Sequence, residues 1–179
     1  MNFLESHIQE LKKAKAGVEK AIAQVSDSEL HWEPAPDANS IAILVKHIAG
    51  NMVSRWTDFL TTDGEKPNRQ RDGEFIDDVA TREQLMSVWD RGWTCLLDSM
   101  GKLTDADMQK TVYIRQEAHS VPLAIVRQTM HYSLHFGQIV YIAKQIRGAE
   151  WKSLSIPKGK SAEYNAAAAV SNGLKARGA

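Results

Sequence analysis

The histidines carry the clearest chemical signal in this sequence. His131 and His135 are four residues apart in a stretch with helical periodicity, so they project about 40° apart around the helix axis and one turn above each other. Two imidazoles placed in this way can converge on one cation, although the same spacing also occurs on many helices that bind no metal. The pair alone leaves metal binding and ordinary packing both open.

A third histidine lies on a different helical stretch. His47 stands beside an apolar stripe, in a polar strip that also holds Asp58, and Gln138 belongs to the corresponding strip around His131 and His135. Burying polar side chains in a core costs free energy unless they find hydrogen-bond partners or a metal. A divalent metal bound by three neutral imidazoles would satisfy all three rings. The alternative is that the histidines only form hydrogen bonds with the backbone, Asp58 or Gln138.

Charged residues near His47 offer two interpretations. Arg55 and Asp58 are three apart on the same helical stretch, so they can pair with each other or with the following loop at 63–78. We favour an ion pair that anchors this loop. The functional alternatives are that Arg55 binds a substrate carboxylate and that Asp58 orients His47 as a hydrogen-bond acceptor.

The loop itself holds a mixed charge cluster. Arg69 and Arg71 lie beside Asp72 and Glu74, a combination that could bind an anion. Because the segment from 63 to 78 is rich in charge and contains glycine and proline, we expect these side chains to be solvated.

Four helix-length segments must position the histidines. Apolar residues recur at threes, fours and sevens over about 2–25, 41–61, 81–100 and 121–147, with Ser40, Thr81 and Ser120 as expected N-caps and Asp63-Gly64 as the expected stop of the second helix. The pattern changes between 111 and 121, which predicts a short β-hairpin or an irregular crossover. The fold class is therefore all-α, an antiparallel four-helix bundle formed by residues 1–165, followed by an alanine-rich tail at 166–179.

Composition narrows the class of protein. The 179 residues balance 22 basic side chains against 22 acidic ones, and this zero net charge argues against nucleic acid as the main partner. No apolar stretch is long enough to span a bilayer, and the first residues lack the apolar core of a secretion signal. A single cysteine, Cys95, excludes an internal disulfide framework. We expect a cytoplasmic protein without a membrane partner.

Several blocks of the sequence resemble a known family. They are NSI at 39–41, VKHI at 45–48, SRWTDFL at 54–60, TDGEK at 62–66, RD and EF at 71–75, HYSLHFGQI at 131–139 and WKSLSIP at 151–157, with Gly159 and Ser161 beyond them. Through these blocks the chain resembles the DinB/YfiT-like superfamily of four-helix-bundle metalloproteins, most closely a bacterial branch of unknown function. The resemblance covers roughly residues 1–165.

The resemblance implies a metal site and a range of activities. It implies one ligand histidine on the second helix and an HxxxH pair on the fourth, which fall on His47, His131 and His135. It also implies that the protein forms a homodimer. The relatives that it implies include thiol S-transferases, which use low-molecular-weight thiols such as bacillithiol, and a mycothiol-dependent isomerase with a related bundle. We expect a divalent cofactor, zinc or nickel first and iron as a further candidate.

These observations lead to one functional hypothesis and two alternatives. The first is a metal-dependent enzyme acting on small molecules, which transfers a low-molecular-weight thiol to an electrophile. The second uses the same metal to activate water as a hydrolase. The third is a non-enzymatic dimer that binds a metal or ligand in a stress response, because no general acid beside the histidines can be identified from the sequence.

Overall fold

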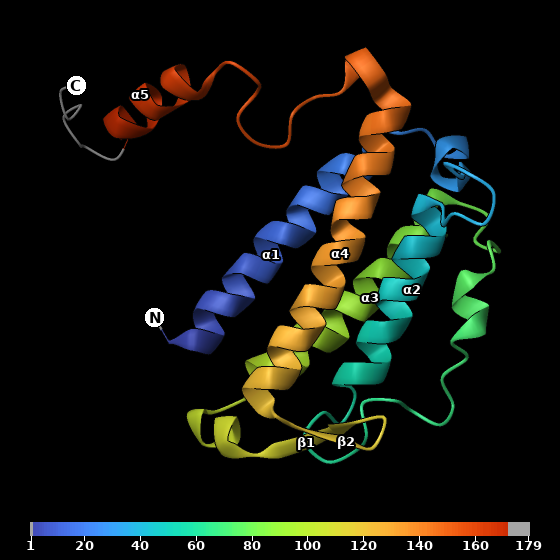
Figure 1. Ribbon diagram of the computed structural model, residues 1–179, viewed down its shortest axis with the longest axis vertical. Coiled ribbons are helices and arrows are strands. Elements are labelled where there is room, and N and C mark those ends of the chain that lie inside the picture. Colours follow the sequence, from blue (N-terminus) through green and yellow to red (C-terminus); the bar gives the residue numbers. More distant parts are fainter. Residues whose placement is uncertain (1, 172–179) are drawn as a thin grey trace.

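The computed structural model describes residues 2–171, so the end of the expected tail, 172–179, lies outside the described residues. Within that range the chain is predominantly helical (Figure 1). The helices are α1 (Phe3–Ile22), α2 (Ile41–Trp56), α3 (Arg82–Gly101), α4 (Val121–Arg147) and α5 (Ser161–Ser171); the strands are β1 (Thr111–Ile114) and β2 (Glu117–Ser120). Short 3₁₀ helices occupy Ser28–His31, Asp72–Phe75, Asp105–Gln109 and Gly148–Glu150.

Side-chain caps fix where the long helices begin. The hydroxyl oxygens of Ser40, Thr81 and Ser120 accept hydrogen bonds from the backbone N–H groups three residues later, which confirms the three predicted starts. Pro122 lies in the first turn of α4, where its missing N–H leaves no intrahelical bond unmade. The positions of His131 and His135 on α4 follow from this start.

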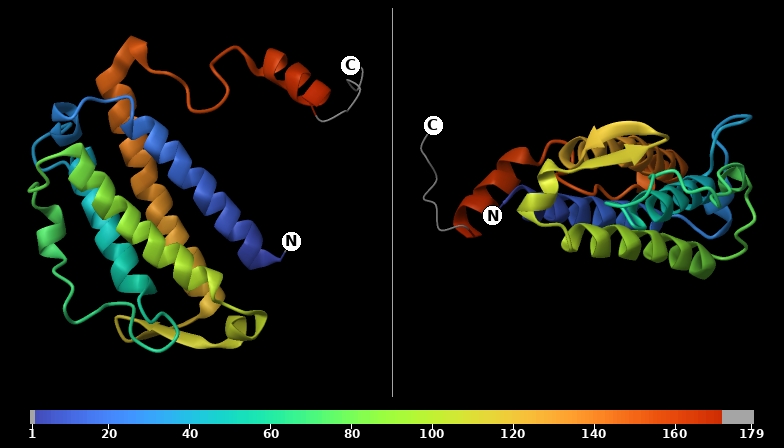
Figure 2. Two further views of the ribbon diagram at one scale, coloured as in Figure 1. Left: turned by 180° about the vertical axis from the view of Figure 1, so that it is seen from behind. Right: turned by 90° about the horizontal axis from the view of Figure 1, so that it is seen from below.

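Helices α1 to α4 lie side by side, and α5 lies apart from them (Figures 1 and 2). The closest pairs are α2 with α3 and α1 with α4, and α2 also contacts α4. Large aromatic side chains such as Trp89, Trp93 and Tyr132 are fully buried between them. Tyr132 links α4 to α2, because its hydroxyl accepts a hydrogen bond from Trp56 Nε1 at 3.0 Å and donates one to Asn51 Oδ1 at 3.2 Å.

The predicted end of the second helix is wrong. Helix α2 ends at Trp56 and not near residue 61, because Thr57 is extended and Asp58 has a φ of 48°, in the left-handed region that a helix cannot include. The Asp58 carbonyl then accepts hydrogen bonds from the N–H groups of Thr61 and Thr62, both at 3.0 Å. The chain therefore leaves the helix early and turns back along α2.

The segment before α4 is a β-hairpin, one of the two forms expected there. Strands β1 and β2 pair antiparallel, and the two turn residues, Arg115 and Gln116, have positive φ values of 55° and 65°. Asp63 holds this turn, since its carboxylate accepts hydrogen bonds from both turn N–H groups at 2.8 and 2.7 Å. Asp63 thus joins the loop after α2 to the hairpin rather than ending α2.

The sequence boundary expected at residue 165 falls inside α5, which begins at Ser161. The described side chains of α5 are mostly exposed. Among the described residues, no helix is both long and apolar enough to span a membrane.

Candidate metal centre

The structure brings the three predicted histidines together. His47, on α2, is only 4% exposed, whereas His131 and His135, on α4, are partly buried. Their Nε2 atoms face a common point: His47 Nε2 lies 3.4 Å from His131 Nε2, and His135 Nε2 lies 3.1 Å from the same atom. One ligand atom from each of the three residues lies within 4.8 Å of the others.

The partners of the other ring nitrogens determine which tautomers are present. His47 Nδ1 lies 2.9 Å from the Glu74 carboxylate, and His135 Nδ1 lies 2.7 Å from the Gln138 amide oxygen. Both partners are acceptors, so both Nδ1 atoms carry protons and, in the neutral rings, both Nε2 atoms present lone pairs. His131 can donate one proton to only one of them. Hydrogen bonds within the cluster therefore leave the Nε2 lone pair of either His47 or His135 without a donor.

A divalent metal fits this arrangement. Ligand nitrogens at about 2.0–2.1 Å from a tetrahedral zinc ion are separated by about 3.3 Å from one another. The two Nε2 separations of 3.4 and 3.1 Å are close to that value. Three imidazoles would leave one coordination position for water or substrate, the arrangement typical of catalytic rather than structural sites.

Local electrostatics keep two of the imidazoles neutral. Burial, and after it the neighbouring histidines and the guanidinium groups of Arg55 and Arg69, together lower the pKa of His131 to about 4. Burial also lowers the pKa of His135, although the hydrogen bond that its Nδ1–H donates to Gln138 raises it. Both rings are thus unprotonated at neutral pH, the form in which imidazole binds a metal.

Glu74 orients His47, although the sequence pattern did not identify it for this role. Its side chain is 9% exposed, and its carboxylate accepts two hydrogen bonds from Arg69, whose Nε and Nη2 each lie 2.7 Å from a carboxylate oxygen. Burial raises the pKa of Glu74, but the hydrogen bonds with His47 and Arg69 lower it more, so that the pKa lies below its usual value. A carboxylate–histidine pair of this kind fixes the ring of a metal ligand.

The expectation of a solvated loop at 63–78 is therefore wrong at Arg69 and Glu74. The side chain of Arg69 is 5% exposed and that of Glu74 is 9% exposed. The 3₁₀ helix Asp72–Phe75 packs against α2 and places Glu74 beside Gly50, where an added Cβ would lie 2.5 Å from Glu74 Oε1. Glycine at position 50 thus makes room for the carboxylate.

The other predicted site residues have mixed positions. Gln138 contacts His135, as a residue that orients a ligand must. Arg55 is buried and donates to the Gly64 carbonyl and to Glu65 at 3.0 Å, so it anchors the loop, but its partner is Glu65 and not Asp58. Asp58 lies beyond the end of α2, and the acceptor that His47 uses is Glu74.

A small pocket opens beside the histidines. It has a volume of about 250 Å³ and is lined by His47 and His131, two amide side chains and five arginines: Asn51, Gln128, Arg55, Arg69, Arg71, Arg115 and Arg127. None of these described lining residues is an aspartate or glutamate. The arginines determine the chemistry of this pocket, which we call the arginine pocket.

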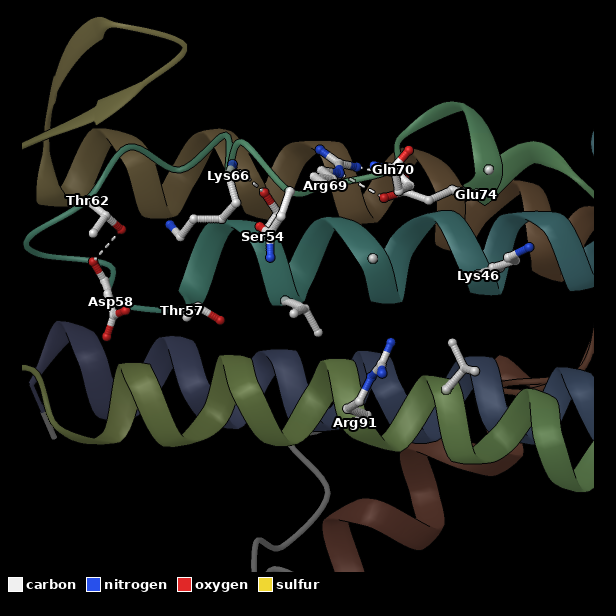
Figure 3. Close-up of a pocket in the computed structure, with 15 residues that line it drawn as sticks. Lys46, Ser54, Thr57, Asp58, Thr62, Lys66, Arg69, Gln70, Glu74 and Arg91 are labelled. Atoms are coloured by element: carbon white, nitrogen blue, oxygen red, sulfur yellow. Dashed lines mark hydrogen bonds and ion pairs between the residues drawn. The ribbon is translucent and has the colours of Figure 1, made fainter.

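A larger groove runs along the neighbouring face of α2 (Figure 3). Its volume is about 740 Å³, and it lies between α2, α3 and the loop that carries Lys66 and Arg69. None of the three histidines lines it, but Glu74 does. Figure 3 shows Glu74 paired with Arg69 at the edge of this groove, so the carboxylate that orients His47 separates the groove from the histidines.

A comparison with known protein families gives a match. A family model described as a protein of unknown function (DUF1572) matches residues 1–160, which include α1 to α4 and all three histidines. No curated protein matches the chain.

Proposed function

The chain belongs to the family described as protein of unknown function DUF1572, and we propose that it is a divalent-metal-dependent enzyme. In this proposal it acts on small molecules and transfers a low-molecular-weight thiol to an electrophile. The observation that carries this proposal is the convergence of three Nε2 atoms, with the ring of His47 held by Glu74 and the ring of His135 held by Gln138. The proposal includes membership of the DinB/YfiT-like superfamily, with α1 to α4 as its four-helix bundle.

The metal would be held by His47, His131 and His135, with zinc or nickel as the expected ion and iron as a further candidate. A divalent ion bound there supplies positive charge that lowers the pKa of a thiol or water. The chain's own residues orient the rings of His47 and His135 and keep those of His131 and His135 unprotonated. They also shield one side of the cluster, since His47 is almost fully buried.

The lining of the arginine pocket favours thiol transfer over hydrolysis. Within the described residues, no carboxylate lines this pocket to protonate the alcohol or amine that leaves in a hydrolysis. A thiolate can instead attack an electrophile whose leaving group departs as a stable anion, which needs no such acid. Cys95 does not supply this thiol, since it lies near Thr57 in a different pocket.

Metal content is the first test of this function. We expect about one divalent ion per chain in tag-free protein and almost none in the His131→Ala/His135→Ala double variant. His31→Ala is the matched control, because His31 also contacts a carboxylate, Asp77 at 2.8 Å, but lies outside the cluster. Parent protein that neither contains metal nor binds added zinc or nickel would contradict the proposal.

Activity is the second test. The parent protein should consume pairs of a thiol and an electrophile faster than simple esters or amides, and His47→Ala should lose both metal and turnover. Faster cleavage of esters or amides would favour the hydrolase instead. Tight ligand binding without turnover of any compound would favour a non-enzymatic binding protein.

We also propose that the protein forms a homodimer through α4. One face of this helix exposes large apolar side chains at spacings of three, four and seven residues: Leu123, Val126, Met130, Leu134 and Tyr141, each at least 45% exposed. An exposed apolar stripe of this kind marks an interaction surface, and a two-fold dimer would cover both copies of it.

A further inference from the structure

The arginine pocket carries more positive charge than its surroundings neutralise. Its five arginines come from four separate segments: Arg55 from α2, Arg69 and Arg71 from the loop after it, Arg115 from the hairpin turn and Arg127 from α4. Three carboxylates pair with them. Glu65 contacts Arg55, Arg69 and Arg115, Glu74 contacts Arg69, and Asp72 lies 3.9 Å from Arg71.

Arg127 adds a charge that nothing in the described part of the chain balances. Its side chain takes part in no hydrogen bond or ion pair there. Glu74 is already shared between Arg69 and His47, so it cannot neutralise a second arginine. Five guanidinium groups that face a small pocket repel one another, and an anion bound among them would lower this repulsion.

Unsatisfied polar atoms point to the same pocket. In the described residues three buried side-chain atoms have no hydrogen-bond partner, and two of them belong to residues that line it: Arg55 Nε, a donor, and Gln128 Oε1, an acceptor. Arg55 is 6% exposed and Gln128 is 5% exposed, so water does not reach either group freely. A buried polar group of this kind needs a partner, which a ligand can provide.

Phe75 positions one of the arginines as well as a histidine. The Arg71 guanidinium lies 5.1 Å from the centre of the Phe75 ring, and the His47 ring lies 4.7 Å from the same ring. Phe75 therefore contacts both Arg71, which lines the arginine pocket, and His47, which belongs to the histidine cluster. A molecule with its anionic end among the arginines would place its other end beside His47 and His131.

We propose that the arginine pocket binds the carboxylate or phosphate group of the substrate, and that Gln128 accepts a hydrogen bond from a hydroxyl beside that group. This inference rests on the proposed function, because it assigns the end of the substrate that does not react. Planar guanidinium groups match the oxygen pairs of such anions. A volume of about 250 Å³ is below the range of about 300–1,000 Å³ that takes drug-sized ligands, so it suits one end of a small molecule.

Calorimetric titration tests this inference without turnover. Succinate, inorganic phosphate and malate are titrated separately into the purified protein, with neutral dimethyl succinate as the control ligand. Binding of at least one anion, weakening as NaCl is raised, is the expected result, and malate should bind at least threefold more tightly than succinate because of its hydroxyl. Equal binding of dimethyl succinate and succinate would overturn the inference.

Two variants localise the binding. Arg115→Gln/Arg127→Gln should weaken the binding of the anion at least tenfold, whereas Arg91→Gln, which removes an arginine from the larger groove, should leave it unchanged. Gln128→Leu should remove the preference for malate over succinate. Unchanged anion binding in the double arginine variant, with its helical circular dichroism intact, would overturn the inference.

A histidine variant separates this inference from the proposed function. His135 does not line the arginine pocket, so His135→Ala should lose metal but retain anion binding within about twofold. Anion binding by a protein that never holds metal would support the pocket while removing the metal-dependent enzyme. Loss of anion binding whenever metal is lost would overturn the pocket, because the anion would then be a ligand of the metal.

Discussion

Glu74 is the residue on which the orientation of His47 depends. Replacing it with glutamine removes the charge and the acceptor pair for Arg69 but keeps the volume. Loss of such an outer partner typically weakens metal affinity by about 10–100-fold. We expect Glu74→Gln to show a loss in that range in competition with a chromogenic zinc chelator.

The exposed neighbour Asp72 provides the control for this measurement. Asp72→Asn removes a carboxylate from the same 3₁₀ helix, but its side chain lies in solvent and contacts neither His47 nor Arg69. It should leave metal affinity unchanged. Equal losses in both variants would mean that the overall charge of the loop, and not the contact with His47, sets the affinity.

Protonation of His131 gives a second prediction at the scale of one residue. Its pKa is lowered to about 4 in the folded protein from the ordinary 6.5, so the unfolded chain takes up the proton first as the pH falls. The free energy of unfolding of the metal-free protein should therefore decrease between about pH 6.5 and pH 4. After allowance for partial exposure, His131 contributes about 1 kcal/mol of the decrease between pH 7 and pH 5.

Urea denaturation of metal-free protein at these two pH values measures this effect. His131→Gln cannot be protonated, so its decrease between pH 7 and pH 5 should be smaller than that of the parent by about the same 1 kcal/mol. The lowered pKa of Glu74 acts in the same direction, but only below its ordinary value of 4.5. Equal pH dependence in parent and variant would assign the decrease to other groups.

Gly50 and Gly92 are both helical glycines with no room for a side chain, but the neighbour of Gly50 belongs to the candidate site and that of Gly92 to the packing of two helices. At Gly50 on α2, an added Cβ would meet the Glu74 carboxylate, whereas at Gly92 on α3 it would lie 2.8 Å from the backbone Cα of Ala49. Alanine favours a helix over glycine by roughly 0.5–1 kcal/mol, so Gly50→Ala should change stability little while displacing Glu74 and weakening metal binding. Gly92→Ala should instead destabilise the protein by about 1–3 kcal/mol, because α2 and α3 must separate.

Thermal unfolding of the metal-free variants, followed by metal titration, checks both expectations. The two substitutions are chemically identical, so each serves as the control for the other. A larger loss of stability in Gly50→Ala than in Gly92→Ala would contradict the packing described for α2 and α3.

Much of the element pattern could be predicted because its determinants are local in the sequence. The caps at Ser40, Thr81 and Ser120 and the spacing of His131 and His135 need only neighbouring residues. The early end of α2 could not be predicted, since it depends on the left-handed conformation of Asp58 and on the distant hairpin that Asp63 holds.

The candidate site could be predicted only in part for the same reason. Helical spacing identified the histidines, but Glu74 reaches His47 from a segment 27 residues away whose charged composition is typical of a solvated loop. The available signal was Phe75, an apolar residue directly after Glu74, which suggests that one side of this segment is anchored. Arg69, whose guanidinium neutralises the buried carboxylate, makes that burial possible.

The apolar stripe on α4 makes a prediction for the molecule as a whole. Leu134 is 69% exposed at the middle of this stripe, so Leu134→Glu should place two repelling charges in the proposed two-fold interface and convert the proposed dimer to monomers. Sedimentation velocity measures the change. Metal content should persist, because the stripe lies on a different face of α4 from His131 and His135.

Ile76→Glu provides the matched control for this substitution. Ile76 is 60% exposed but lies in the loop before α3, away from the stripe. The Ile76→Glu variant should leave the proposed dimer intact. A parent protein that sediments as a monomer at all concentrations would remove the proposed dimer.

The distance between the ligands along the chain bears on when the site can form. His47 and His131 are separated by 84 positions, and His135 follows one turn later. During synthesis a ribosome must therefore complete α1, α2, α3 and most of α4 before the third imidazole emerges. Metal uptake would be one of the last events of biogenesis, and a nascent chain stalled before residue 135 would hold at most two of the three ligands.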